Sequence, residues 1–220
     1  MNNALTISGL TKTYKDFVLD KVSFSVPEGS IVGLIGENGA GKSTTINATL
    51  GLIQKDAGYI SIMGQEELDN DTKEQIGVVF DGSNYPEILS PKRLNRVMKN
   101  IYHSWDEHTY MSLLKKFSLP ADKQIKQFSK GMKKQAAFCL ALAATPDYLI
   151  LDEPIDGLDP IVRRKLWHFI MGDVAERDMT VLISSHNARE MEDVCNYIGI
   201  IAGGKMIFEG DLLEIMPASI

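Results

Sequence analysis

The chain has 220 residues, 44% of which are hydrophobic, and a formal net charge of −6 at pH 7. This length and composition are typical of one globular domain with a buried core. The negative charge argues against a nucleic-acid-binding face, and the longest uninterrupted apolar run, residues 136–144, is too short to span a bilayer.

The first third of the chain is predicted to be rich in strands. Apolar β-type segments separated by Gly- and Pro-containing turns place strands at residues 4–10, 17–26, 31–36, 58–63 and 75–80. A helix is predicted over residues 42–52. Gly64 and the acidic segment 66–71 are predicted to form a loop.

The middle of the chain, residues 88–144, is predicted to be helical and to interrupt the strand-rich pattern. Ser90 is a suitable N-cap, and Pro91 suits the first position of a helix. Apolar residues then follow at helical spacing in two groups, at positions 94, 97, 98 and 101 and at positions 110, 113, 114 and 117.

The last third returns to alternating strands and helices. A helix is predicted over Pro160–Arg177, with Asp159 as its N-cap. Strands are predicted at residues 148–151, 180–184, 197–201 and 205–209, the last two joined across Gly203 and Gly204, and further helices at residues 187–195 and 211–216.

Neither the cysteines nor the N-terminus indicates an extracellular protein. Cys139 and Cys195 lie in apolar helical segments without metal-ligand spacing, so both are predicted to be buried, reduced thiols. The first residues lack a basic region followed by an apolar one, so no secretion signal is expected.

The most informative segment is residues 36–44, which read GENGAGKST. It lies between a predicted strand and a predicted helix, which is the context of a phosphate-binding P-loop. Glycines let backbone N–H groups surround an anion, Lys42 can reach the β- and γ-phosphates, and the Ser43 hydroxyl can bind Mg²⁺. A chance glycine turn is the alternative, and the flanking elements disfavour it. The residues predicted to bind nucleotide here are Gly36, Glu37, Asn38, Gly39, Ala40, Gly41, Lys42, Ser43 and Thr44.

Two adjacent carboxylates, Asp152 and Glu153, follow the apolar strand at residues 148–151. A carboxylate at the carboxyl end of a sheet strand can hold Mg²⁺ beside a triphosphate. The next one can orient and polarise an attacking water. An acidic turn without function is the alternative, and the P-loop upstream disfavours it.

Three further signals are weak when taken alone. Ser129 and Gly131 precede an apolar helix, where Ser is also a common N-cap. His186 follows a sheet strand, although a single His is more often structural. Tyr14 lies in an early loop and offers an aromatic face to a purine, although tyrosines at strand edges are common.

Taken in chain order, Tyr14, GENGAGKST, FSKGM, LILDEP, Asp159 and His186 resemble the motifs of the ATP-binding subunit of ABC transporters. The resemblance covers nearly the whole chain, and the joint set is specific. It implies a single domain over residues 1–220 with an α/β fold of the ABC-type P-loop ATPases. Such a fold has a RecA-like core, an antiparallel β subdomain and a helical subdomain, here at about residues 88–144.

The resemblance also implies roles for individual residues. Tyr14 would stack on adenine, and Asp152 would join Ser43 in holding Mg²⁺. Glu153 would be the catalytic base, and His186 would contact the γ-phosphate. Asp159 would belong to the D-loop. The expected cofactors are ATP and Mg²⁺.

The signature residues of the family, here Ser129 and Gly131, complete the nucleotide site of a second subunit. The resemblance therefore implies an ATP-driven homodimer or heterodimer, with two ATP molecules sandwiched head to tail. It also implies an integral membrane permease as partner, no nucleic acid, and a cytoplasmic location at the inner face of the membrane.

Two departures from the family pattern stand out. Lys130 and Met132 replace a glycine and the glutamine of the usual signature Leu-Ser-Gly-Gly-Gln. Asp81 stands where the family has its Q-loop glutamine, which normally senses Mg²⁺ and the membrane subunit. Because a carboxylate near the γ-phosphate would be repelled, we expect Asp81 to turn away toward a permease-facing groove unless Mg²⁺ neutralises it.

The departures and the segment KNIYHSWD at residues 99–106 resemble a small bacterial export-type branch with a separate permease. The main alternative is a soluble, non-transport ABC ATPase, which usually has tandem cassettes or a long coiled coil. A P-loop GTPase is disfavoured because the base-reading motif Asn-Lys-x-Asp is absent. A regulator that binds nucleotide without turnover is disfavoured by Glu153 and His186.

Overall fold

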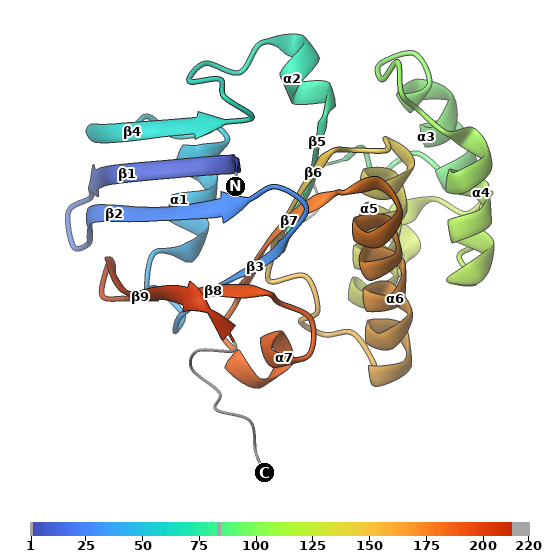
Figure 1. The fold of residues 1–220 in the computed structure, drawn as a ribbon. Helices are drawn as coiled ribbons and strands as arrows, with labels where there is room; N and C mark the ends of the chain where they lie inside the picture. The colour runs from blue at the N-terminus through green and yellow to red at the C-terminus, as the bar shows by residue number, and fades with distance from the viewer. Residues whose placement is uncertain (1, 83–84, 213–220) are drawn as a thin grey trace.

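A computed structural model describes residues 2–82 and 85–212. Figure 1 shows two sheets on one side of the molecule and a group of helices on the other. The predicted α/β class is confirmed, and so is the arrangement of an antiparallel sheet, a mainly parallel sheet and a helical region.

The smaller sheet is antiparallel and consists of β1 (Asn3–Thr13), β2 (Val18–Pro27) and β4 (Ala57–Ile62), in the order β2-β1-β4. Its strands alternate between buried and exposed side chains, as expected for a sheet with one covered face. The buried face packs on α1 (Lys42–Thr49), whose Ile46 shares a core cluster with residues of both sheets.

The larger sheet has the strand order β5-β6-β7-β3-β8-β9 and is parallel except for β9. Its strands are β5 (Ile76–Val79), β6 (Tyr148–Asp152), β7 (Thr180–Ser185), β3 (Ile31–Ile35), β8 (Tyr197–Ala202) and β9 (Lys205–Asp211). Every residue of β3, β6 and β7 is buried, because helices or the second sheet cover both faces.

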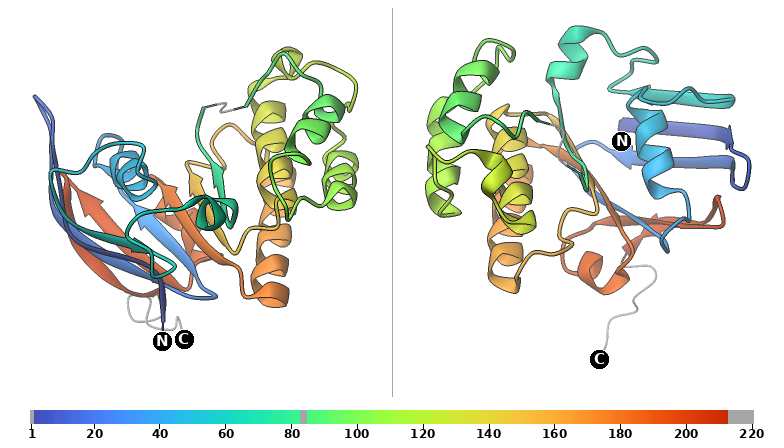
Figure 2. Two further views of the ribbon diagram at one scale, coloured as in Figure 1. Left: turned by 90° about the horizontal axis from the view of Figure 1, so that it is seen from above. Right: turned by 180° about the vertical axis from the view of Figure 1, so that it is seen from behind.

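The helices divide between the faces of the larger sheet and a separate lobe. The sheet is covered on one face by α5 (Lys130–Ala143), α6 (Pro160–Arg177) and α7 (Ala188–Glu192). The views of Figures 1 and 2 agree that α3 (Pro91–Met98) and α4 (Glu107–Lys116) lie outside α5, away from the antiparallel sheet. Together with α5 and the 3₁₀ turn Ile125–Gln127, they account for the helices predicted over residues 88–144.

Capping residues fix several helix starts as the sequence predicted. The Ser90 hydroxyl accepts from the N–H of Arg93, and the Asp159 carboxylate accepts from the N–H groups of Ile161 and Val162. Helix α6 therefore has the predicted bounds.

Other predicted elements need correction. The expected loop 66–71 runs into a short helix, α2 (Asn70–Glu74), because the Asp69 side chain caps the N–H of Thr72. Helices α1 and α7 are shorter than residues 42–52 and 187–195. Residue 211, where a helix was predicted to begin, is the last of β9, and residues 213–216 of that prediction lie outside the described residues.

Within residues 2–82 and 85–212, no helix combines the length and the apolar character needed to cross a membrane.

Both cysteines are buried free thiols, as predicted. Burial raises the pKa of Cys195 to about 12 and raises the pKa of Cys139 further. A raised pKa lowers the thiolate fraction at neutral pH, and the thiolate is the reactive form. We expect the native protein to resist labelling by a chromogenic disulfide reagent at pH 7–8 and to release both thiols after unfolding in guanidinium. Rapid labelling of the native protein would contradict this.

Candidate nucleotide-binding and catalytic site

The loop between β3 and α1 has the backbone shape of an anion site. Gly41 occupies the N-cap position of α1 at φ 114°, and no side chain caps the helix. The first N–H groups of α1 therefore have no capping side chain, and they suit a phosphate. A Cβ at Gly41 would meet Leu19 Cδ1 at 2.7 Å, so a larger residue would disturb the loop.

Gly36 is required at the start of the loop by a close backbone contact. A Cβ there would lie 2.3 Å from the carbonyl oxygen of Ile201 on β8. The Gly36 N–H donates to the carbonyl of Ser185, which joins the loop to the end of β7. The loop is thus held between the two strands that flank β3.

Lys42 provides a buried positive charge at the centre of the loop, with a side chain only 5% exposed. Its ammonium donates to the carbonyl oxygens of Gly36 at 2.7 Å and Glu37 at 3.1 Å. It also forms an ion pair at 3.0 Å with Oε1 of Glu153. The structure therefore brings the predicted phosphate-binding lysine and the predicted catalytic carboxylate together.

Asp152 and Glu153 lie where β6 ends, as predicted. The Ser184 hydroxyl on β7 donates to Oδ1 of Asp152 and accepts from the Glu153 N–H at 3.0 Å. Glu153 has φ 48°, a left-handed conformation that is unusual for a residue with a side chain. This turn directs the chain away from the sheet immediately after the two carboxylates.

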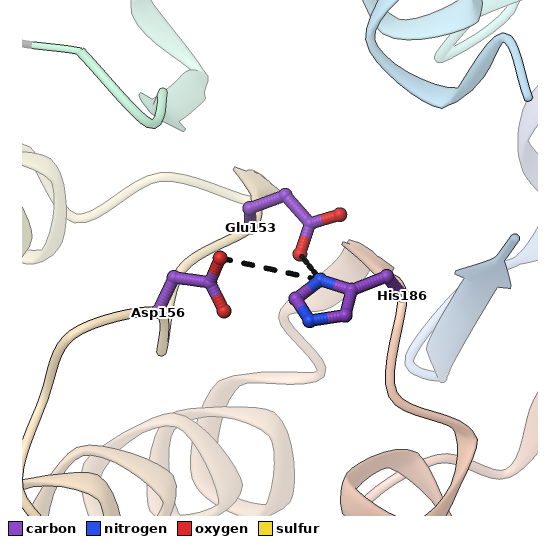
Figure 3. Close-up of side chains that lie close together, drawn as sticks. All are labelled: Glu153, Asp156 and His186. Carbon is purple, nitrogen blue, oxygen red and sulfur yellow. Dashed lines mark hydrogen bonds and ion pairs between the residues drawn. The ribbon is translucent and has the colours of Figure 1, made fainter. Parts of the chain in front are cut away.

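His186 follows β7 and contacts the same carboxylate. Its Nδ1 lies 2.9 Å from Oε2 of Glu153 and 4.0 Å from Oδ2 of Asp156. Dashed lines mark these two contacts in Figure 3. Glu153 thus bridges Lys42 and His186, one oxygen to each. The sequence analysis assigned no role to Asp156 or Ser184. The only indication that they belong to the site was their closeness in sequence to Glu153 and His186, respectively.

Oxygen ligands suited to Mg²⁺ are present among the predicted residues. Ser43 is exposed on the first turn of α1, and Asp152 is buried at the end of β6 with one oxygen bound by Ser184. A hydroxyl and a carboxylate are hard donors of the kind that Mg²⁺ takes beside phosphates. The residue types therefore fit the ion.

Tyr14 is linked to the P-loop by Phe17, which contacts both. The Tyr14 N–H donates to the Phe17 carbonyl, and the two rings are 6.5 Å apart. Phe17 in turn lies against the loop, since its Cζ would be 3.1 Å from a Cβ at Gly41. Tyr14 is 43% exposed, which leaves ring surface accessible to a base.

Comparison with known proteins agrees with this geometry. A family model described as ABC transporter matches residues 19–156, more than half of the chain. The chain belongs to the ABC transporter family.

Individual relatives of this family cover most of the chain. It is 37% identical over 208 residues to the Lantibiotic transport ATP-binding protein SrtF of Streptococcus pyogenes, covering 93% of this chain and 90% of the relative. It is 33% identical over 218 residues to the Nod factor export ATP-binding protein I of Burkholderia pseudomallei (strain 1710b), covering 95% and 71%.

Solved ABC ATPase structures have the same fold. One, entitled "Structure of ATP binding subunit of ABC transporter", superposes with a TM-score of 0.86 at 30% identity, covering 96% of this chain and 91% of the other. The ATP-binding cassette MJ0796, solved as a dimer bound to ADP and Pi, has a TM-score of 0.82 at 24% identity, covering 94% and 98%, and shows the fold alone.

The predicted signature residues, Ser129 and Gly131, make their contacts outside the P-loop of their own chain. Ser129 caps α5 by accepting from the N–H of Met132, and a Cβ at Gly131 would lie 3.5 Å from the Gly157 carbonyl. Asp159 caps α6. Among the described residues, no hydrogen bond or ion pair joins Ser129, Gly131 or Asp159 to residues 36–44.

Asp81, which the sequence analysis placed at the Q-loop position, faces α5. Its carboxylate lies 3.0 Å from the Lys134 ammonium and 3.9 Å from that of Lys130. The sequence interpretation considered Mg²⁺ or a turn toward the permease and missed these lysines. Lys134 is four residues before buried Phe138, and this helical spacing was the available signal that it faces inward.

Proposed function

We propose that this ABC protein hydrolyses MgATP with Glu153 as the general base. The observation that supports this most is the Glu153 carboxylate, which lies between Lys42 and His186 at the end of β6. A carboxylate held there can accept the proton of a water that attacks the γ-phosphate. Lys42 and the N-terminus of α1 would bind the phosphates, and His186 would contact the γ-phosphate.

Asp152 and Ser43 would hold Mg²⁺, which neutralises phosphate charge when bound. Ser184 would keep the Asp152 carboxylate in place through its hydrogen bond. Tyr14 would stack on the adenine, next to the Phe17 side chain that packs against the loop.

We further propose that ATP joins two ATPase subunits. The support is that, among the described residues, neither Ser129 nor Gly131 forms a hydrogen bond or ion pair with residues 36–44 of the same chain, so both remain available to a second subunit. The MJ0796 cassette, which shares the fold, has been solved as a dimer. A two-fold pair would place the signature of each subunit over the ATP of the other, with Asp159 near the interface.

The Glu153→Gln protein is expected to be monomeric or weakly associated without nucleotide and dimeric with ATP. ATP would be bound by both subunits and retained without turnover, so its binding free energy would contribute to association. Light scattering after size exclusion, with and without ATP, measures this. Equal dimerisation without ATP, or no dimer at any ATP concentration, would contradict a nucleotide site shared between two subunits. As a control, the double variant Glu153→Gln with Ser129→Arg should stay monomeric in ATP.

We propose that the pair powers a separate membrane permease of an export system and is located at the cytoplasmic face of the membrane. Relatives named for lantibiotic transport and Nod factor export support this direction. A groove of about 130 Å³ between β5 and the helical region is lined largely by apolar side chains, including Phe80, Tyr85, Met98 and Trp105, and has room for an apolar side chain of such a partner.

Isolation of the tagged chain from membranes separates transport from a soluble ABC function. We expect a polytopic membrane protein to be recovered with the chain at a fixed ratio. Recovery from the soluble fraction alone, without such a partner, would favour the soluble alternative. The transported molecule would then be sought among substrates whose export depends on that permease.

A further inference from the structure

Lys134 is a buried lysine on α5 whose side chain is only 3% exposed. Its ammonium has three acceptors: Oδ1 of Asp81 at 3.0 Å, the carbonyl oxygen of Glu153 at 2.6 Å and the carbonyl oxygen of Asp156 at 3.1 Å. A lysine ammonium has three N–H donors, so these contacts use all of them. Its burial is therefore compensated by one charge and two backbone carbonyls.

Two of these contacts hold the turn that carries Glu153. Glu153 has φ 48°, a conformation that persists only where the surroundings fix it. Its N–H donates to the Ser184 hydroxyl at 3.0 Å, and its carbonyl accepts from Lys134. Both peptide groups of the residue are thus fixed, and the bond to Asp156 extends the restraint through the turn.

The third contact fixes the lysine itself. Asp81 follows β5, whereas Lys134 lies on α5 and Glu153 follows β6. The Asp81 carboxylate is 53% exposed, but the ammonium it binds is buried. Asp81 therefore supplies the only formal negative charge among the three acceptors of Lys134.

We infer that Lys134 is a positioning residue for Glu153 and that Asp81 orients Lys134. The inference rests on the proposed role of Glu153 as base. Lys134 does not touch the reacting atoms; it holds the backbone from which the Glu153 carboxylate reaches Lys42 and His186. The charge at the Q-loop position thereby acts on the catalytic turn through a lysine of the same chain.

The test compares Lys134→Met, Asp81→Asn and the double variant, with Lys133→Met as the matched control. Lys133 is the next residue on α5 and pairs with Glu87 instead. Single-turnover hydrolysis, with the protein in saturating excess over MgATP, gives the rate of the chemical step, and equilibrium binding of a fluorescent ATP analogue gives the affinity. Thermal unfolding of each variant identifies any that fails to fold.

We expect Lys134→Met to lower the single-turnover rate at least about 10-fold, because small displacements of a catalytic group are costly. Affinity for the analogue should change less than about 3-fold, since the P-loop is intact. Asp81→Asn should lower the rate less, about 3-fold, because Asn still accepts from Lys134. In the Lys134→Met protein, Asp81→Asn should have no further effect.

A wild-type rate in folded Lys134→Met protein would overturn the inference, and so would equal losses in Lys133→Met and Lys134→Met. Additive effects of Asp81→Asn and Lys134→Met would overturn the part assigned to Asp81. If the Lys134→Met protein does not fold, a wild-type rate in the Asp81→Asn protein would by itself overturn the role assigned to Asp81. The rate of the Glu153→Gln protein separates the two proposals. Full activity of that protein would overturn the role of Glu153 as base. If that protein is inactive and the Lys134→Met protein is fully active, only the positioning role of Lys134 is overturned.

Discussion

Replacing Glu153 by Gln is expected to lower the rate of ATP hydrolysis by about 10²–10⁴-fold while ATP binding is retained. Gln keeps the size and a hydrogen-bonding oxygen but cannot accept a proton from water at neutral pH. The Lys42 ammonium loses its charged partner in this variant, so its positive charge becomes more available to phosphate. Phosphate release at saturating MgATP and equilibrium ATP binding measure the two effects.

Glu192→Gln is a suitable control, because this exposed glutamate lies on α7 and takes no part in the site. Its rate should equal that of the unmodified chain. Undiminished hydrolysis by the Glu153→Gln protein would remove Glu153 from the role of base. Loss of ATP binding in that protein would instead show that the carboxylate is needed to form the loop.

Replacing Lys42 by Met is expected to weaken ATP binding by about 10- to 100-fold, since a hydrogen bond to a charged group contributes about 1.5–3 kcal/mol. The ammonium is buried and directed by the carbonyls of Gly36 and Glu37, so it is already placed for a phosphate. Hydrolysis should fall with binding, because the same charge stabilises the transferred phosphoryl group. Calorimetric titration with ATP at several Mg²⁺ concentrations measures the affinity.

Lys55→Met, at an exposed lysine beyond α1, controls for the loss of one positive charge. It should bind ATP as the unmodified chain does. An unchanged affinity in the Lys42→Met protein would contradict the assignment of the P-loop. A lowered melting temperature in that protein would be explained by the Glu153 carboxylate, which remains at the loop without its cationic partner.

The elements whose signals are local could be predicted from the sequence. Apolar runs marked the buried strands β3, β6 and β7, and a cap at Asp159 marked the start of α6. Helix α2 was missed because its signal is one short side-chain cap within an acidic segment. The length of α7 was overestimated because the apolar residues Val194 and Cys195 continue the helical spacing beyond Glu192, where the helix ends.

The candidate site likewise contains residues that could be predicted from the sequence and contacts that could not. Lys42, Asp152, Glu153 and His186 each lie at a strand end or loop whose chemistry the sequence displays, and the structure brings Lys42, Glu153 and His186 into direct contact. The Lys134 contacts could not be predicted, because they join three segments that are distant in sequence. In the sequence, an acidic residue at position 81 and a lysine on an apolar helix face are two unrelated features. Only the fold shows that the two side chains form an ion pair.

The position of β3 has a consequence for when the chain acquires its function during synthesis. The strand that carries the P-loop pairs with β7 and β8, both from the last fifth of the described chain. The antiparallel sheet uses only residues 3–62 and can form early, whereas β3 lacks its neighbours until residue 202 has been made. At about 5–20 residues per second, the loop emerges many seconds before its support. We expect nascent chains stopped before β7 to bind no ATP and to expose the apolar edges of β3, which makes this interval the stage at which chaperones would act.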